Sequence, residues 1–138
     1  MNKKNIAIAI LASGQSKRFQ GIKLLAKIRE QSLLSLSVQT LQTLHLPLFV
    51  VLGANREQIV PTLDVNIIIN EQYEQGISSS IVVASKKLYS ENNYSAILFC
   101  LADQPLIVAK HYKNIVDIYQ NNRYDIVATQ YMKDDKRT

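Results

Sequence analysis

A glycine, a serine and three basic side chains follow the first apolar segment of the chain, residues 6–11. They are Gly14, Ser16, Lys17, Arg18 and Lys23. A glycine lets the backbone turn tightly, and backbone amides together with fixed positive charge can hold an anion. The pattern predicts a loop that binds phosphate groups, most naturally those of a polyphosphate. A solvated basic loop without a ligand is the alternative.

Two common phosphate-binding motifs do not fit this loop. The P-loop needs two glycines five positions apart, with Lys and then Ser or Thr after the second. Here Gly14 and Gly21 are seven positions apart, and Ile22 follows Gly21. The dinucleotide fingerprint G-x-G-x-x-G is also absent, which lowers the expectation of a nicotinamide or flavin enzyme. What remains is the pattern L-x-x-G-x-S-x-R-x-x-G-x-K, which runs from Leu11 to Lys23.

A second candidate for chemistry is Asp103, which follows the apolar segment 96–101. An aspartate in this place is often only the cap of the next helix. It can also be an oxygen ligand for Mg²⁺, which binds through one or two carboxylates together with substrate phosphates. The choice between the two depends on whether Asp103 lies near the basic loop.

The hydrophobic pattern predicts the elements that position these residues. Strands are expected at 6–11, 48–52, 65–69, 96–101 and 124–129, and helices at 32–45, 55–60, 77–88 and 108–120. Asn55 is expected to cap the short second helix. The apolar stripes expected on the last two helices are Ile77, Ile81, Ala84 and Leu88, and then Val108, Tyr112, Ile115 and Tyr119.

Strands that alternate with helical crossovers favour an α/β fold with a doubly wound, mainly parallel sheet. In such sheets ligands bind beyond the carboxyl ends of the strands, at the point where the strand order reverses. If the order is 3-2-1-4, the strands at 6–11 and 96–101 are neighbours. The loop from Gly14 to Lys23 then lies beside Asp103.

Composition narrows the partners. The 138 residues, with 47% hydrophobic and 20% charged side chains, are expected to form one globular domain. The net charge is +5, and the basic residues that gather near the first loop favour an anionic small molecule: Lys17, Arg18, Lys23, Lys27 and Arg29. No second basic stripe with interleaved aromatics suggests nucleic acid.

Cys100 is the single cysteine, so no intrachain disulfide can form and a reducing cytoplasm is expected. We expect it in the core rather than in catalysis, because it lies inside an apolar strand. No stretch approaches the roughly 20 apolar residues that span a membrane.

Three segments resemble, in the same order, motifs of the molybdenum cofactor nucleotidyltransferases, which are MobA-like NTP transferases, and especially their cytidylyltransferase branch. They are LASGQSKRFQGIK at 11–23, GISSSI at 76–81 and LADQP at 101–105. The resemblance implies a Rossmann-like nucleotidyltransferase fold. It also implies transfer of CMP from CTP to molybdopterin, with release of pyrophosphate and with Mg²⁺ as cofactor. CTP and molybdopterin would be the partners, with a molybdoenzyme or its chaperone as a further candidate.

Carried over by position, the resemblance implies roles for individual residues. The catalytic residues would be Lys23, Arg18 and Asp103, with Asp103 as the metal ligand. The nucleotide would contact Leu11, Ala12, Ser13, Gly14, Ser16, Arg18, Lys23, Gly76, Ser78, Ser79 and Ser80. The serines at 78–80 could instead only cap a helix.

The chain departs from the family pattern in three places. Gln20 stands where relatives usually have a glycine, and Ser13 replaces the usual second alanine or glycine. The chain ends at Thr138, before a Gly-x-Pro segment and a further acidic motif, so we expect a C-terminally shortened single domain that lacks the acceptor-binding part. Besides a shortened cytidylyltransferase, a nicotine-pigment-type oxidoreductase and a non-catalytic nucleotide-binding remnant remain open.

Overall fold

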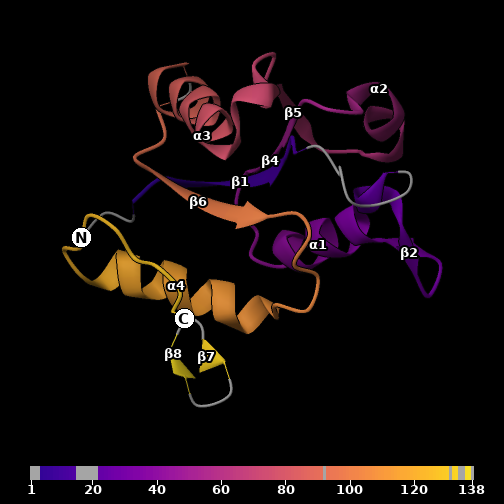
Figure 1. Cartoon of the computed structure of the whole chain (residues 1–138). Helices are drawn as coiled ribbons and strands as arrows, with labels where there is room; N and C mark the ends of the chain where they lie inside the picture. Colours follow the sequence, from indigo (N-terminus) through magenta and orange to yellow (C-terminus); the bar gives the residue numbers. More distant parts are fainter. Residues whose placement is uncertain (1–3, 15–21, 92, 131, 134–135, 138) are drawn as a thin grey trace.

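A computed structural model of the chain describes residues 4–14, 22–91, 93–130, 132–133 and 136–137. Its centre is a sheet of four parallel strands in the order β5-β4-β1-β6 (Figure 1). The strands are β1 (Ile6–Ala12), β4 (Leu48–Leu52), β5 (Asn66–Ile69) and β6 (Ala96–Leu101). In order of appearance this is 3-2-1-4, so the predicted α/β fold and its strand order are confirmed.

Strand β1 lies in the middle of the sheet, and all seven of its residues are buried. Successive side chains of a strand point to opposite faces. Ile8 and Ile10 therefore pack on one face, whereas Ala7 and Ala9 pack on the other. The continuous apolar run of β1 is what a parallel strand covered on both faces requires.

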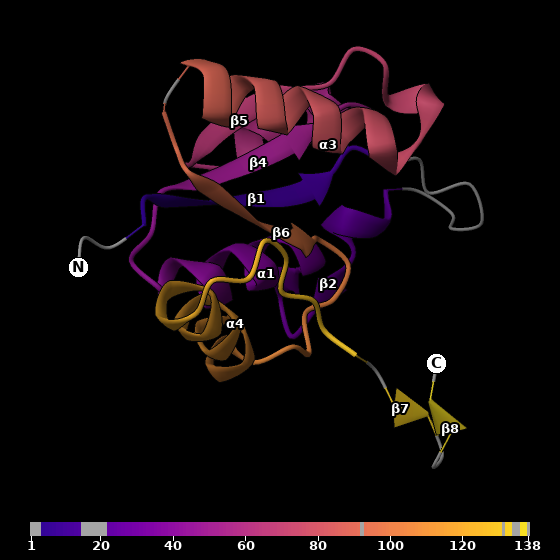
Figure 2. The same ribbon diagram turned by 90° about the vertical axis from the view of Figure 1, so that its left-hand side faces the viewer.

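Helices cover both faces of the sheet (Figure 2). On one side lie α1 (Leu33–Gln42) and α4 (Ala109–Asn121). On the other lies α3 (Ile77–Ser85), which continues into a π-helical segment, η4 (Lys86–Glu91). A short helix, α2 (Arg56–Ile59), and a 3-10 turn, η2 (Val60–Thr62), follow β4. Asn55 stands at the N-cap of α2 with φ of 61°, and its side chain makes no capping hydrogen bond there.

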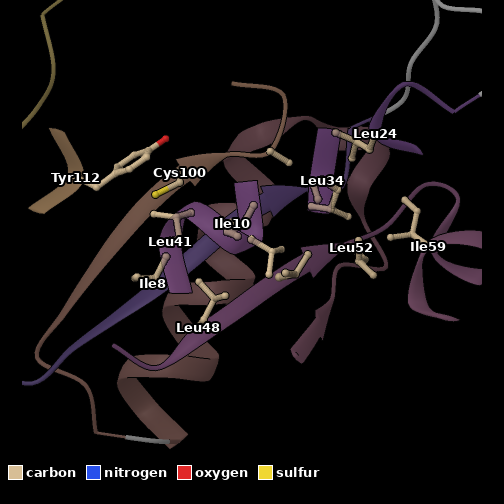
Figure 3. Close-up of a cluster of buried hydrophobic side chains, with 14 residues drawn as sticks. Ile8, Ile10, Leu24, Leu34, Leu41, Leu48, Leu52, Ile59, Cys100 and Tyr112 are labelled. Carbon is tan, nitrogen blue, oxygen red and sulfur yellow. The ribbon is translucent and has the colours of Figure 1, made fainter. Parts of the chain in front are cut away.

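The larger core cluster lies between the sheet and α1 and α4 (Figure 3). Cys100 of β6 is only 4% exposed and lies in this cluster, where Figure 3 shows it near Tyr112 of α4. The expectation that Cys100 is a core residue is confirmed. Burial raises the pKa of its thiol to about 12, which suppresses the reactive thiolate at neutral pH.

The buried face of α3 differs from the predicted stripe. Ala84 and Leu88 are fully buried as expected, but Ile77 and Ile81 are 55% and 37% exposed. Ser80 takes the position one turn before Ala84 and is fully buried. The helix points Ser80 into the core because the Ser80 hydroxyl has hydrogen-bonding partners there, Asn70 and Ser13. On α4 the stripe holds at Tyr112, whereas Val108 lies outside the helix and is 63% exposed.

The predicted strand at 124–129 is wrong, since this segment has no regular structure. A strand needs a hydrogen-bonded neighbour, and within the described residues β6 pairs with β1 alone. Ile126 is 84% exposed, and Val127 is only partly buried. It lines a cavity of about 610 Å³ together with β6 and α4. His111 of α4 shares a hydrogen bond of 2.8 Å with Thr129 across this cavity.

Several short elements complete the fold. They are η1 (Lys23–Leu25), β2 (Lys27–Ile28), β3 (Gln31–Ser32), η3 (Tyr73–Gln75), β7 (Met132–Lys133) and β8 (Lys136–Arg137). Strands β2 and β3 form a hairpin whose two turn residues, Arg29 and Glu30, have φ of 50° and 71°, as two-residue hairpin turns require. In the part of the chain that the structure describes, no helix is long and apolar enough to cross a membrane.

Candidate functional site

The carboxyl ends of β1 and β6 lie on the same side of the molecule as hairpin β2–β3 (Figure 1). At this edge the Lys23 Nζ lies 3.3 Å from Asp103 Oδ2. Strand order alone predicted that the first loop would reach Asp103, and for Lys23 this is confirmed. The two side chains are 45% and 43% exposed, so both charges are accessible from solvent.

Two hydrogen bonds hold the backbone of Ala102, the residue directly before Asp103. The Ala102 amide donates to the Leu11 carbonyl at 3.2 Å, which extends the pairing of β6 with β1 beyond the end of the strand. The hydroxyl of Ser37, buried in α1, donates to the Ala102 carbonyl at 3.0 Å. Asp103 does not cap the next helix, because Val108 is the N-cap of α4. The capping interpretation of Asp103 is therefore excluded.

Lys23 begins the 3-10 turn η1, which is anchored in the core through Leu24, only 8% exposed. The carbonyl of Lys23 accepts from the Ala26 amide at 3.0 Å, and the Ala26 carbonyl accepts from the Leu33 amide at 3.0 Å. This chain of bonds joins η1 to the start of α1. The amine of Lys23 thus extends from an anchored backbone toward the edge of the sheet.

Gly14 lies at the end of β1, and its φ is outside the left-handed region that favours glycine. The expected tight turn is therefore not what requires a glycine here. A Cβ added to Gly14 would meet no described atom within 4 Å. Within the described part of the chain, the missing side chain leaves space beside the Gly14 backbone.

A buried polar network joins the ends of β1 and β5 to the first turn of α3. Asn70, fully buried, donates through Nδ2 to the hydroxyls of Ser79 and Ser80, both at 2.9 Å. Ser80 in turn shares a hydrogen bond with Ser13. The sequence pattern does not single out Asn70, because an asparagine at the end of an apolar run resembles a loop residue. The signal that points to the network is Ser80, one turn before Ala84 and two before Leu88 on one helical face.

The loop after β5 has a second anchor. Glu71 lies 2.8 Å from Arg56 of α2, and this hydrogen bond is the main cause that raises the pKa of Arg56. Gly53, at the end of β4, packs against the side chain of Tyr73, and an added Cβ would lie 2.8 Å from Tyr73 Cγ. Only glycine fits at this contact, which closes the loop over the sheet edge.

The predicted site residues are distributed as follows. Leu11, Ala12 and Ser13 are buried. Gly14, Gly76 and Ser78 are exposed, Ser79 is partly buried and Ser80 is buried. The Ser13–Ser80 bond brings the first and second motifs together, and the Lys23–Asp103 pair brings together the first and third. Ser16, Lys17 and Arg18 lie outside the described residues.

The described residues contain no group of three or more His, Cys, Asp or Glu side chains that could hold a metal ion. Asp103 offers one accessible carboxylate. This donor set suits Mg²⁺ when phosphate oxygens of a substrate supply further ligands. Among the described residues, no set of side chains fits a cation held by the protein alone.

The model of the MobA-like NTP transferase domain matches residues 8–137. The chain belongs to the MobA-like NTP transferase domain family. This confirms the resemblance seen in the three motifs at the level of the family. The comparison with curated proteins gives no match.

Solved structures agree with this MobA-like fold. Rv0371c from Mycobacterium tuberculosis H37Rv is similar with a TM-score of 0.76 and 22% identity, over 88% of this chain and 63% of that one. Its complex with manganese gives a TM-score of 0.68 at 18% identity, over 86% and 61%. A CMP:2-keto-3-deoxy-manno-octonic acid synthetase complexed with CTP gives 0.68 at 14%, over 88% and 48%. The chain thus spans about half to two thirds of the length of these structures.

Proposed function

We propose that this MobA-like chain binds a nucleoside triphosphate at the carboxyl edge of its sheet and transfers the nucleoside monophosphate to an acceptor, releasing pyrophosphate. The observation that carries the proposal is the exposed Lys23–Asp103 pair at the carboxyl edge of the sheet, in a chain of the MobA-like NTP transferase domain family. A cation and a carboxylate at the switch point of a parallel sheet suit a triphosphate and its divalent metal.

The Lys23–Asp103 pair suits exchange for a ligand better than it suits stabilisation of the fold. Exposed ion pairs contribute up to about 1 kcal/mol, and both partners here are more than two-fifths exposed. A triphosphate presents Lys23 with more negative charge than one carboxylate does. The amine then turns to the phosphates, and the Asp103 carboxylate becomes available to hold Mg²⁺.

In the proposed reaction an oxygen of the acceptor's terminal phosphate attacks the α-phosphorus. A new O–P bond forms, the bond from the α-phosphorus to the bridging oxygen breaks, and pyrophosphate leaves with that electron pair. Lys23 and Arg18 stabilise the negative charge on the phosphates, and the site aligns the reacting groups. Mg²⁺ held by Asp103 would neutralise further phosphate charge. The reaction needs no side-chain nucleophile, in agreement with the buried thiol of Cys100.

The finer proposal is that CTP is the donor and molybdopterin the acceptor, as the three motifs imply, with a molybdoenzyme or its chaperone as the next partner. Ser13 supports CTP, because its side chain is slightly larger than that of alanine and leaves less room for a purine than glycine does. Calorimetric titration with CTP and GTP in Mg²⁺ tests this choice. Tighter binding of GTP would contradict it.

The function is tested by measuring pyrophosphate release from ATP, CTP, GTP and UTP with Mg²⁺, with and without molybdopterin. We expect release with CTP that depends on molybdopterin. Binding of CTP without pyrophosphate release under any condition would favour the non-catalytic remnant. Absence of both, with oxidation or reduction of a pigment substrate, would favour the oxidoreductase.

A further inference from the structure

Helix α1 buries four side chains, and one of them is polar. Leu34, Val38 and Leu41 are apolar, whereas Ser37 carries a hydroxyl and is only 5% exposed. A buried hydroxyl without a hydrogen-bonding partner costs stability. The Ser37 hydroxyl has a partner, because it donates to the Ala102 carbonyl at 3.0 Å, across 65 positions of the chain.

The partner of Ser37 lies outside its own helix. Serine and threonine hydroxyls inside a helix can donate to the carbonyl one turn earlier in the same helix. Thr40 of α1 does so, since its hydroxyl donates to the Leu36 carbonyl at 3.0 Å. Ser37 instead joins α1 to the turn after β6. The bond therefore connects two elements that are distant in the chain.

The bond also lies directly before Asp103. Strand β6 ends at Leu101, and Ala102 follows with an exposed fraction of only 2%. Its amide donates to the Leu11 carbonyl at 3.2 Å, and its carbonyl accepts from Ser37. An apolar residue in place of Ser37 would still pack in the core but would remove this donor. The hydroxyl thus acts on the backbone from which the Asp103 side chain extends.

The same helix supports Lys23. Leu33, the first residue of α1, donates its amide to the Ala26 carbonyl at 3.0 Å, and the Ala26 amide donates to the Lys23 carbonyl at 3.0 Å. The amino end of α1 is therefore bonded to the backbone that carries Lys23, and Ser37 is bonded to the backbone next to Asp103. One helix supports both charges of the exposed pair, which are 3.3 Å apart.

We propose that Ser37 is a positioning residue of the nucleotide site. Its hydroxyl holds the backbone beside Asp103, so that the carboxylate reaches the metal of a bound nucleoside triphosphate while Lys23 reaches the phosphates. Ser37 acts through Asp103 and not by contact with the ligand. The proposal rests on the proposed binding of a nucleoside triphosphate with Mg²⁺.

The test is the dependence of CTP affinity on Mg²⁺, measured by calorimetric titration over a series of Mg²⁺ concentrations and in EDTA. Ser37→Ala should need about fivefold more Mg²⁺ for the half-maximal gain in CTP affinity, which corresponds to about 1 kcal/mol for one hydrogen bond. Its CTP affinity in EDTA should not change, because Asp103 then holds no metal. The control Thr40→Val removes a hydroxyl that bonds within α1, and it should change neither quantity.

The Asp103→Asn background shows whether Ser37 acts through Asp103. Here Ser37→Ala should have no further effect on the response to Mg²⁺, because the carboxylate that Ser37 positions is gone. A merely structural role would lower CTP affinity by the same factor in Mg²⁺ and in EDTA, with Asp103 or with asparagine in its place.

Ser37→Thr and Ser37→Val form a second pair, of nearly equal size, which differs in the hydroxyl. Only the valine variant should raise the Mg²⁺ requirement, and this pair decides the question if Ser37→Ala is unstable. Circular dichroism confirms that each variant is folded.

Three results would overturn the inference and leave nucleotide binding intact. They are an unchanged Mg²⁺ requirement in folded Ser37→Ala, an equal loss of CTP affinity with and without Mg²⁺, and a CTP affinity of the unmodified protein that does not respond to Mg²⁺. If the unmodified protein did not bind CTP in Mg²⁺ at all, the proposed function itself would be wrong, and the inference would be wrong with it.

Discussion

Replacing Gly76 by alanine isolates the energy of one backbone conformation. Gly76 is the N-cap of α3, with φ of 94° and ψ of −175°, a region that is essentially reserved for glycine and costs other residues about 1–3 kcal/mol. An added Cβ would meet nothing within 4 Å, so no steric clash contributes. Escape from this conformation would disturb the hydrogen bond from the Ser79 amide to the Gly76 carbonyl, which is 3.1 Å long.

Alanine also reduces the conformational entropy of the unfolded chain, which stabilises the folded state by about 0.4–1 kcal/mol. The net loss expected for Gly76→Ala is about 1–2 kcal/mol, or a fall in Tm of roughly 3–8 °C. Urea and thermal unfolding followed by circular dichroism measure it. Gly14→Ala is the matched control. The φ of Gly14 lies outside the left-handed region, and an added Cβ would meet no described atom within 4 Å. The stability of this variant should equal or slightly exceed that of the unmodified protein. Equal losses in the two variants would refute the reasoning.

Further predictions concern three single residues, Lys23, Cys100 and Lys4. Lys23→Ala should weaken CTP binding by about 1.5–3 kcal/mol and leave cytidine binding nearly unchanged, since the proposed contact of Lys23 is to phosphate. Equal losses of affinity for both ligands in calorimetric titrations would show that Lys23 has only a structural role. Cys100 should resist iodoacetamide at pH 8 in the folded protein and react in urea, because burial raises the pKa of its thiol to about 12. Mass spectrometry measures the labelling, and rapid labelling of the native protein would contradict this prediction. The pKa of Cys100 is raised only in the folded state, so the unfolded chain loses the thiol proton at lower pH than the folded protein does. The free energy of unfolding should therefore fall as the pH rises from about 9 to 12. Lys4→Met should lower stability by about 1 kcal/mol. The Lys4 amine donates to the Tyr119 carbonyl, in the last turn of α4, at 2.9 Å and lies 4.0 Å from the centroid of the Tyr119 ring. Lys86→Met, at an exposed position, is the control, and equal urea midpoints for the two variants would contradict a stabilising role of Lys4.

The sheet was predictable because its strands are continuous apolar runs. The observed bounds of β4 and β6 match the predicted segments. The alternation of strands with helices predicted a parallel sheet, for which the order 3-2-1-4 was assumed. That order was enough to place Lys23 near Asp103, residues that are 80 positions apart in the chain. In this part of the site, topology carried the prediction.

The remaining features depend on tertiary contacts that periodicity does not encode. The burial of Ser80 rather than Ile77 follows from hydrogen bonds to Asn70 and Ser13, which come directly after β5 and β1 and lie 10 and 67 positions from Ser80 in the chain. The segment 124–129 has the composition of a strand, but strand formation requires a neighbour as well as propensity. Local pattern therefore identified the elements, and long-range polar pairing decided which faces are buried.

The central claim is that Asp103 serves a bound nucleotide and its metal, and Asp103→Asn tests it most directly. Titrations of CTP into the unmodified protein and this variant, in Mg²⁺ and in EDTA, are compared with pyrophosphate release. Without a metal, the Asp103 carboxylate repels the triphosphate, so the variant should bind CTP in EDTA as well as or better than the unmodified protein. In Mg²⁺ its pyrophosphate release should be abolished. Equal weakening of CTP binding with and without Mg²⁺ would show that Asp103 only supports the turn after β6, and would contradict the account.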